Sequence, residues 1–196
     1  EIDTKIAWYE NNGSQSFTTH TIANSVIPRS VFAIDVDGDG DIDVLSASQN
    51  DSKVNWYEND GSQNFTTNTI SSNAGDEPWS VYAIDLDKDG DIDVLSALFE
   101  GDKIVWYENN GSDTFTTHDI YTNTDQGMSV FAIDMDGDND IDVLSASDGA
   151  NNVSWHENNG SQSFTAHTIT SSADGPASVY AIDVDGDGDI DVLSAS

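Results

Sequence analysis

The sequence repeats itself with a period close to 49 residues. Tryptophans recur at intervals of 48, 50 and 49 residues, at Trp8, Trp56, Trp106 and Trp155. Aspartate-rich segments recur at intervals of 50, 49 and 49 residues, beginning at Asp35, Asp85, Asp134 and Asp183. A period of this length is far too long for a coiled coil, and it indicates a repeat architecture such as a solenoid or a propeller.

Each repeat contains four short runs that read as β-strands. In the second copy they are 80–87 (SVYAIDLD), 91–98 (DIDVLSAL), 53–59 (KVNWYEN) and 64–70 (NFTTNTI). Valine, isoleucine, threonine and aromatic residues dominate these runs, as is typical of strands. Asn-Gly or Asp-Gly lies between the third and fourth runs, where a tight hairpin turn needs positive φ angles. No segment has a clear period of 3.6 residues, so we expect almost no helix.

The order of the runs predicts an all-β propeller of four-stranded antiparallel blades. Within residues 1–196, taken as a single domain, we expect one split blade and three whole ones: 1–22 plus 178–196, 30–70, 80–120 and 129–169. Pairing the two ends completes a fourth blade and hides sheet edges that would otherwise invite aggregation. Two ring sizes stay open: one chain forms a four-bladed ring, or two chains share an eight-bladed ring. The chain starts at Glu1 without a methionine or a leader peptide, so we expect a processed protein or an excised fragment.

The composition favours cations as partners and excludes several classes of site. The chain has 37 acidic and 5 basic residues, for a formal net charge of −32. This charge argues against binding to nucleic acids or anionic membranes. The sequence has no cysteine, so disulfides, thiolate zinc sites and cysteine nucleophiles are excluded. No apolar run approaches the roughly 20 residues of a membrane span.

The acidic residues are concentrated in four segments, and the first of these is 35–43 (DVDGDGDID). Aspartates occupy positions 1, 3, 5, 7 and 9, and a glycine at position 6 permits a sharp bend. Carboxylates this close repel one another or take up protons unless a cation neutralises them. Calcium binds six to eight oxygens and favours such loops, in which position 7 donates its backbone carbonyl. The pattern therefore predicts a Ca²⁺ site in each repeat.

The segment is not an EF-hand. Position 12, where an EF-hand carries a bidentate acid, is occupied by Ser46 in the first copy. The residues that follow, DVLSAS, have no helical face, so the loop must lie in a hairpin between two strands.

The motif D-x-D-x-D-G-x-x-D between two strands, repeated together with a tryptophan strand, resembles the FG-GAP/VCBS repeats. These repeats occur in the propellers of integrin α-chains, in many secreted bacterial proteins and in some fungal lectins. The resemblance implies a β-propeller with Ca²⁺ in the hairpin between the first and second strands of each blade, or about four ions per chain. Integrin-type propellers usually have seven blades, more than the four repeats present here.

The resemblance also implies a set of ligands. Side-chain ligands would be Asp35, Asp37, Asp39, Asp43, Asp85, Asp87, Asp89, Asp93, Asp134, Asp136, Asp138, Asp142, Asp183, Asp185, Asp187 and Asp191. Backbone carbonyls would come from Asp41, Asp91, Asp140 and Asp189. The third copy has Asn139 in place of the glycine, and asparagine tolerates the left-handed conformation.

The irregular segments are where a ligand is expected. The blade connections (23–29, 71–79, 121–128 and 170–177) and the loops between second and third strands vary among repeats, and both should lie at the end opposite the acidic hairpins. Variable loops on a rigid scaffold commonly carry binding residues. The residues that break the repeat there are Arg29, Trp79, Phe99, Tyr121 and Met128. They predict either a platform for a sugar ring or plain loop packing.

Periodic residues are interpreted as architecture. The tryptophans alternate in phase with apolar residues, so we expect them in a core between blades, with a sugar-stacking row as the alternative. His20, His118 and His167 share one position in the outermost strand, where a surface role is expected. No base and nucleophile stand at a fixed spacing, so we expect no enzyme.

These observations predict a secreted or cell-surface recognition module that binds a glycan or an extracellular protein. A calcium-rigidified scaffold or spacer is the alternative, and a propeller lyase is a third, less favoured reading. A monomer and a ring-sharing homodimer are both consistent with the repeats.

Overall fold

The computed structural model describes residues 4–25, 27–73, 76–112 and 114–196. These residues form β-strands joined by turns and loops, and they contain no helix, as the sequence predicts. Consequently no helix in the described ranges is long and apolar enough to cross a membrane. Residues 1–3 of the expected split blade, and residues 26, 74 and 75 of the variable loops, lie outside the described residues.

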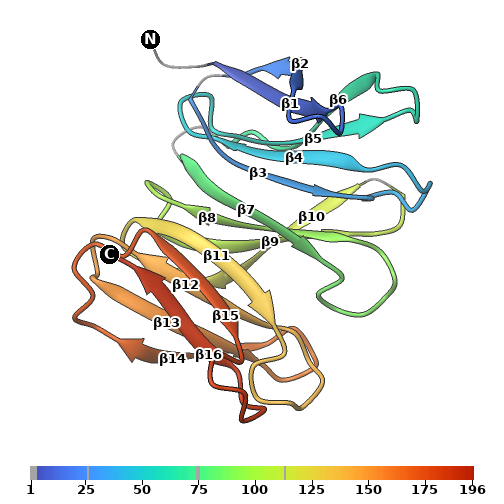
Figure 1. Cartoon of the computed structure of the whole chain (residues 1–196). Helices are drawn as coiled ribbons and strands as arrows, with labels where there is room; N and C mark the ends of the chain where they lie inside the picture. The colour runs from blue at the N-terminus through green and yellow to red at the C-terminus, as the bar shows by residue number, and fades with distance from the viewer. Residues whose placement is uncertain (1–3, 26, 74–75, 113) are drawn as a thin grey trace.

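Three complete blades follow one another along the chain (Figure 1). The first contains β3 (Pro28–Ile34), β4 (Asp43–Ser48), β5 (Lys53–Asn59) and β6 (Phe65–Ser71). The second contains β7 (Pro78–Ile84), β8 (Asp93–Leu98), β9 (Lys103–Asn109) and β10 (Phe115–Tyr121). The third contains β11 (Gly127–Ile133), β12 (Asp142–Ser147), β13 (Asn152–Asn158) and β14 (Phe164–Thr170). In each blade the four strands pair antiparallel in sequence order, which confirms the predicted blade.

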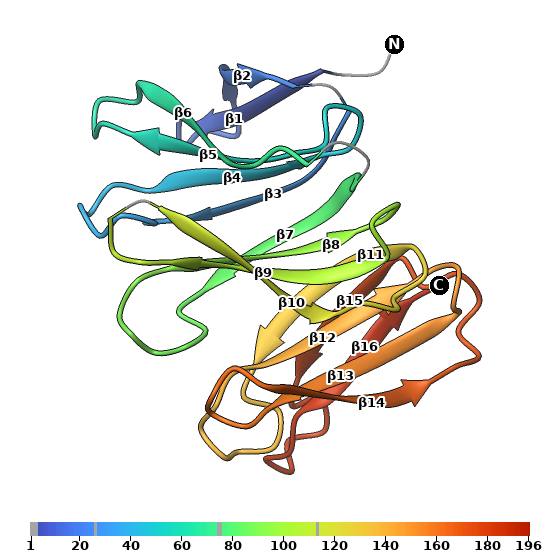
Figure 2. The same ribbon diagram turned by 180° about the vertical axis from the view of Figure 1, so that it is seen from behind.

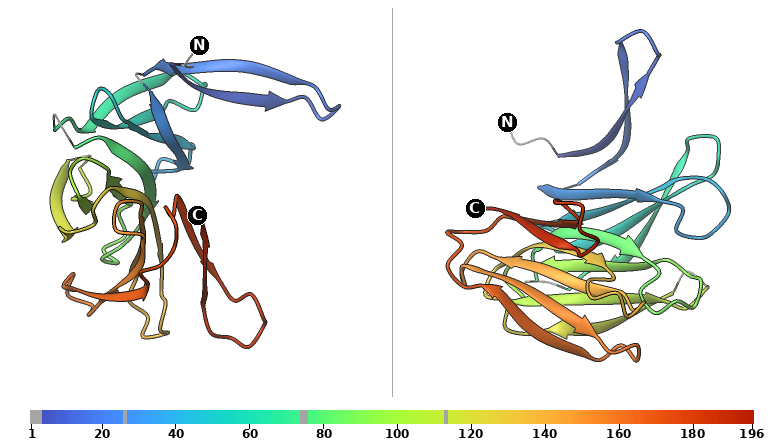
Figure 3. Two further views of the ribbon diagram at one scale, coloured as in Figure 1. Left: turned by 90° about the vertical axis from the view of Figure 1, so that its left-hand side faces the viewer. Right: turned by 60° about the horizontal axis from the view of Figure 1, so that its bottom comes forward.

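The remaining strands form two half-blades. The N-terminal half-blade contains β1 (Lys5–Asn11) and β2 (Phe17–Asn24), which correspond to the third and fourth strands of a blade. The C-terminal half-blade contains β15 (Ser178–Ile182) and β16 (Asp191–Ala195), which correspond to the first and second strands. The blades follow an arc, and the half-blades lie at its two ends (Figures 2 and 3). Within this chain they are separate two-stranded sheets, so the split blade is not assembled here.

The hydrophobic core lies between neighbouring blades. One cluster of buried residues joins the first and second blades, and a second cluster joins the second and third. A third cluster, which includes Leu144 and Val179, joins the third blade to the C-terminal half-blade. The second strand of a blade therefore has neighbours on both faces, and every residue of β8 and β12 is buried.

The repeated tryptophans take part in this core. Trp56 and Trp106 are buried in the first and second clusters, which confirms the prediction of a core between blades. Trp155 is half-buried and packs against the third cluster. In the second and third blades the outer-strand histidine packs against the tryptophan of the same blade, with ring centroids 4.7 Å apart in both pairs. In the three complete blades the tryptophan is therefore covered by its own blade and the next.

The residue after the tryptophan faces the other side of the blade. Tyr57, Tyr107 and His156 occupy this position in the complete blades and are buried. The Tyr57 hydroxyl lies 3.2 Å from Ser46 Oγ, and in the third blade His156 Nε2 lies 2.9 Å from the equivalent Ser145 Oγ. Tyr9 occupies the same position in the N-terminal half-blade and is 60% exposed.

His156 makes the stability of the third blade sensitive to pH. Burial lowers the pKa of His156 to about 4, with a smaller contribution from His167, against 6.5 in the unfolded chain. Between these values the unfolded chain binds a proton that the folded chain does not bind, so stability falls as the pH falls from about 6.5 to about 4. Tyrosine fills the equivalent position in the other two complete blades.

We expect His156→Tyr to remove this component of the pH dependence. Between pH 8 and pH 5 the wild-type protein should lose about 2 kcal/mol more unfolding free energy than the variant. Urea denaturation of both proteins at the two pH values, in saturating calcium, measures the difference. Equal losses in the two proteins would contradict the prediction.

Candidate metal sites

Four acidic loops join the first and second strands of the complete blades and of the C-terminal half-blade. Each loop turns through two left-handed residues, at positions 4 and 6, which in the first loop are Gly38 (φ 75°) and Gly40 (φ 98°). Lys88 takes position 4 in the second loop with φ 65°, and Asn139 takes position 6 in the third with φ 77°. The third loop therefore keeps the shared backbone path without a glycine at position 6, as the sequence predicts.

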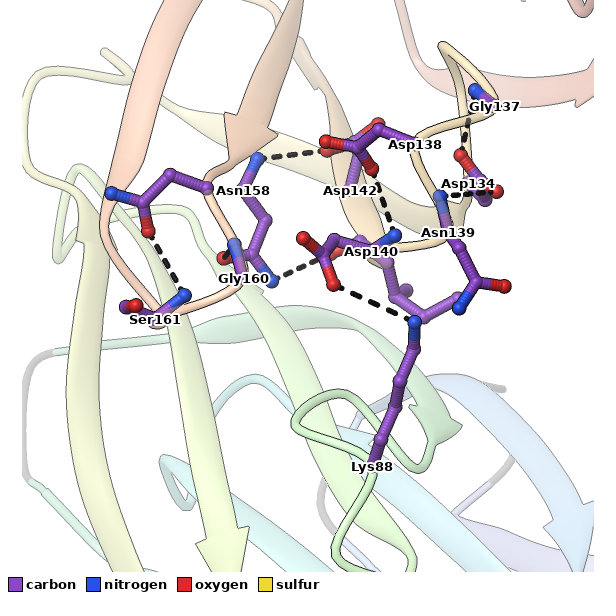
Figure 4. A network of polar contacts seen from close by, with 12 residues as sticks. Lys88, Asp134, Gly137, Asp138, Asn139, Asp140, Asp142, Asn158, Gly160 and Ser161 are labelled. Atoms are coloured by element: carbon purple, nitrogen blue, oxygen red, sulfur yellow. Dashed lines mark hydrogen bonds and ion pairs between the residues drawn. The ribbon is translucent and has the colours of Figure 1, made fainter.

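The position-1 carboxylate organises the loop by accepting hydrogen bonds from its backbone. In the first loop, Gly38 N donates to Asp35 Oδ1 at 2.8 Å and Gly40 N donates to Asp35 Oδ2 at 3.0 Å. The third loop repeats this arrangement around Asp134, with donors at positions 4 and 6 (Figure 4). These contacts curl the chain around the position-1 side chain.

Each loop brings three aspartate side chains together. One oxygen from each member of a triad lies within 4.8 Å of the others, in these groups: Asp35, Asp37, Asp39; Asp85, Asp87, Asp93; Asp134, Asp136, Asp142; and Asp183, Asp185, Asp191. Oxygens that bind one calcium ion at about 2.3–2.6 Å are at most about 5 Å apart. The triads therefore fit a single cation of this size.

The membership of the triads differs between the first loop and the rest. Positions 1 and 3 contribute in all four. The third member is the position-5 residue Asp39 in the first loop and the position-9 residue in the other three. The position-5 residues of those three loops lie outside their triads: Asp89, Asp138 and Asp187. The position-9 residue Asp43 lies outside the first triad.

The position-9 carboxylate ties the loop to the third strand of its blade. In the second blade, Asp93 is fully buried, and its Oδ1 accepts from Asn109 N at 2.8 Å while its Oδ2 accepts from Leu86 N at 3.0 Å. Asp43 and Asp142 are buried in the same way and make the equivalent bonds to Asn59 and Asn158. This residue thus fixes the loop relative to the blade.

Burial opposes the ionisation of these carboxyl groups. It raises the pKa of Asp93 to about 7, although the hydrogen bonds from Asn109 and Leu86 act in the opposite direction. It also raises the pKa of Asp43 and Asp142 above the ordinary value of 3.8. A bound divalent cation is the usual means of keeping such groups ionised at neutral pH.

The position-7 side chain points away from the triad. Asp41 lies over the hairpin turn between the third and fourth strands, where a Cβ added to Gly61 would come within 2.4 Å of its Oδ2. The turn therefore requires glycine, both for this approach and for its φ of 73°. In the third blade the position-7 carboxylate of Asp140 lies 3.5 Å from Lys88 Nζ of the second blade (Figure 4). The position-7 carboxylate is therefore placed outside the triad.

The variable loops do lie at one end of each blade, away from the acidic loops. The blade connection pairs with the loop between the second and third strands: Gln49 N donates to Ile27 O at 3.0 Å, and Phe99 N donates to Glu77 O at 3.0 Å. The prediction that both loop types share an end is therefore confirmed.

Three of the five residues predicted to bind a ligand come together at that end. The Trp79 ring lies 4.5 Å from the Phe99 ring, and the Arg29 guanidinium lies 4.0 Å from the centroid of Trp79. We call Arg29, Trp79 and Phe99 the loop-end stack. Gln49 accepts from Arg29 Nε at 2.7 Å and donates to Glu77 at 2.7 Å, so two residues that the sequence analysis missed hold the stack.

The other two predicted residues lie elsewhere. Tyr121 is half-buried, with its ring 4.9 Å from the buried His156 ring. Met128 is half-buried in β11. Neither belongs to the loop-end stack, so the five residues do not form one surface.

The repeats match a known family over almost the whole chain. The family described as "FG-GAP-like repeat" matches residues 3–46, 35–96, 89–145 and 134–194. No curated protein sequence matches the chain.

Several solved structures resemble this chain in fold. A structure of an Agrocybe aegerita lectin, described as recognising non-reducing terminal N-acetylglucosamine, is 18% identical (TM-score 0.61), with 95% of this chain and 54% of the lectin chain covered. A chain of a nidogen/laminin complex is 7% identical (TM-score 0.62), with 91% and 63% covered. The V. cholerae biofilm matrix protein Bap1 is 20% identical (TM-score 0.53), with 99% and 32% covered. This chain thus spans less than two thirds of each.

At these identities the solved structures show a shared fold and no more. The repeat matches cover the acidic loops and the strands around them, which are the features that the sequence analysis took as the signature of the repeat. The chain belongs to the FG-GAP-like repeat family and has the blades of a β-propeller.

Proposed function

We propose that this chain is a calcium-binding, non-catalytic recognition module that acts outside the cell and binds a glycan at the loop-end stack. The observation that carries the calcium assignment is the convergence of three aspartate oxygens within 4.8 Å in all four acidic loops. The ligands are the aspartates at positions 1, 3, 5 and 9 together with the position-7 carbonyl, as the family resemblance implies.

Calcium fits these loops better than the other common divalent cations. Each triad offers only carboxylate oxygens, which hard cations prefer, and no thiolate or imidazole belongs to it. Calcium accepts six to eight oxygens in flexible geometry, whereas magnesium demands a near-ideal octahedron. Extracellular calcium modules bind at about 10⁻⁴–10⁻³ M, a range suited to a secreted protein. The ion would stabilise the fold, because it binds the folded loop and not the unfolded chain.

The loop-end stack supports a binding role. Variable loops on a rigid scaffold commonly carry recognition, and an aromatic ring beside a hydrogen-bonding cation is a frequent platform for a sugar. Arg29 is exposed, while Trp79 and Phe99 are half-buried. The related folds include a lectin, a chain from a nidogen/laminin complex and a biofilm matrix protein, which supports an extracellular recognition role without identifying the ligand.

The histidines support a non-catalytic role. His156 and Ser145 lie within hydrogen-bond distance of each other, but both are buried. In the first blade the serine is kept and Tyr57 takes the place of the histidine. The outer-strand histidines each contact a glutamate of the same blade, as His118 contacts Glu108 at 2.6 Å. Their repetition from blade to blade indicates architecture.

A calcium-rigidified scaffold or spacer is the second candidate, and one observation favours it. Trp79 already packs against both Arg29 and Phe99, so part of its ring surface is used within the protein.

We expect Asp37→Asn to lower the number of calcium ions bound by one per chain. Asp37 belongs to the first triad, whereas the Asp41 side chain faces the Gly61 turn. Asp41→Asn is therefore the matched control, because it removes the same charge from the same loop and should leave the number unchanged. Isothermal titration of calcium into the chelator-treated proteins counts the sites. An equal loss in both variants would show that the loop acts only through its total charge.

We expect a glycan array, probed in millimolar calcium and again with EGTA, to show calcium-dependent binding to a defined glycan class. Trp79→Ala should weaken that binding by about 30-fold, because an aromatic residue central to an interface contributes about 2 kcal/mol. Its melting temperature and circular dichroism should match those of Ile169→Ala, a control that removes an exposed apolar side chain from the outer strand β14. The absence of glycan binding by folded protein would favour the scaffold.

A further inference from the structure

We propose that the repeated tryptophan of each complete blade is a positioning residue of the calcium site, with its indole N–H directed at the position-9 carboxylate of the same blade. This role rests on the calcium assignment proposed above. It makes a residue of the core between blades part of the metal site. The tryptophans concerned are Trp56, Trp106 and Trp155, and their partners are Asp43, Asp93 and Asp142.

Three indole nitrogens are buried at equivalent positions without a hydrogen bond. Nε1 of Trp56, Trp106 and Trp155 has no hydrogen-bond partner among the described residues. As whole side chains, Trp56 and Trp106 are only 1% and 3% exposed, so water does not reach these donors. Buried polar groups in proteins are almost always paired, and an unpaired one needs a specific explanation. Because the same donor is unpaired in three successive blades, the explanation must lie in a feature that the blades share.

Strand pairing places the position-9 carboxylate beside each indole. In the second blade Leu95 pairs with Trp106, and Asp93 lies two residues before Leu95 on the same strand. Side chains two residues apart on a strand point to the same face, so Asp93 is a diagonal neighbour of Trp106. Diagonal neighbours are about 7–8 Å apart, which is within reach of an aromatic side chain. The other two complete blades keep this register.

The indole N–H also acts on the carboxyl group. Burial is the largest influence on the pKa of Asp93 and raises it to about 7, while the Trp106 indole is among the groups that act in the opposite direction. The tryptophans of the first and third blades act in the same way on their position-9 carboxyl groups. A donor lowers the pKa of a carboxyl group by stabilising its charged form, which requires the donor to face it. The N–H therefore faces the carboxylate, although the pair does not reach ordinary hydrogen-bond geometry.

The carboxylate has acceptor sites for both the indole and an ion. Asp93 Oδ1 accepts from Asn109 N, and its Oδ2 accepts from Leu86 N. A carboxylate has about four lone-pair sites, so about two remain. Asp93 also belongs to the second triad. A donor behind a metal ligand commonly fixes the orientation of that ligand. We therefore expect the indole to complete its hydrogen bond when the loop binds the ion.

The ring of the same tryptophan packs between blades. Trp106 lies in the buried cluster that joins the second and third blades, together with Val130 of β11. One side chain thus extends from the metal loop of its own blade to the junction with the next. Plain packing accounts for the burial of the ring, but it does not account for an N–H that faces a carboxylate in three blades.

Trp106→Phe tests this role, because it keeps an aromatic ring in the core and removes the N–H. We expect the unmodified protein to bind one calcium ion at each of its four triads with similar affinity. In the variant, one of these sites should be weaker by about tenfold, the effect of losing one hydrogen bond to a charged group. Isothermal titration of calcium into the chelator-treated proteins measures both the number and the affinity of the sites.

Ile104→Val is the matched control for lost packing. Ile104 is buried in the same cluster as Trp106 and lies two residues earlier on β9, opposite Ala97 and farther from the acidic loop. The control should lower the melting temperature and leave all four affinities unchanged. Four unchanged sites in Trp106→Phe, or an equal loss of affinity in Ile104→Val, would overturn the role. Unmodified protein that binds no calcium would overturn the calcium assignment itself, so the two failures are distinguishable.

A measurement on the unmodified protein gives a test if the variants fail to fold. The indole ¹H–¹⁵N signals in nuclear magnetic resonance spectra report hydrogen bonding at Nε1. When calcium is added, the signals of Trp56, Trp106 and Trp155 should move downfield, because a hydrogen bond to a carboxylate deshields the proton. The signal of Trp79, which lies at the opposite end of its blade, should stay in place. Three unmoved signals in a protein that binds calcium would overturn the role.

Discussion

The buried carboxylate at position 9 of the acidic loop is the contact on which each complete blade depends. Asp93 joins the loop, through Leu86, to the third strand, through Asn109, and it does so with no exposed surface. Placing that charge in the interior is unfavourable unless it is paired or neutralised. The proposed cation would supply that neutralisation, because the other aspartates of the loop carry charge of the same sign and oppose the ionisation of Asp93. The acidic loop and the blade are therefore joined through this one side chain.

Packing between blades turns these units into an arc. In the complete blades the tryptophan strand contributes to a core that the next blade completes, so a blade cannot bury its apolar surface alone. The same rule explains the ends of the arc, where Tyr9, Val31 and Leu193 are exposed at positions that are buried elsewhere.

The sequence predicted those features that repeat. The 49-residue period, the β-branched runs and the Asn-Gly turns identified the strands, and the phase of Trp56 and Trp106 identified the core between blades. The position-7 aspartates were expected to contribute no side chain, and Asp41 does point away from its triad. What depends on three-dimensional closure was not predictable. Tyr9 and Tyr57 share the segment WYEN, yet Tyr9 is 60% exposed and Tyr57 is 1% exposed, because only Tyr57 lies in a four-stranded blade. The contact of Arg29 with Trp79 joins residues 50 positions apart and has no periodic signal.

A crystal structure of the protein grown in calcium chloride, with an anomalous difference map, tests the central claim most directly. The account predicts one anomalous peak in each acidic loop, within about 2.6 Å of the carboxylates at positions 1 and 3 and of the position-7 carbonyl. Loops that keep their curled path with no peak, in crystals saturated with calcium, would contradict the claim that a cation holds the aspartates together.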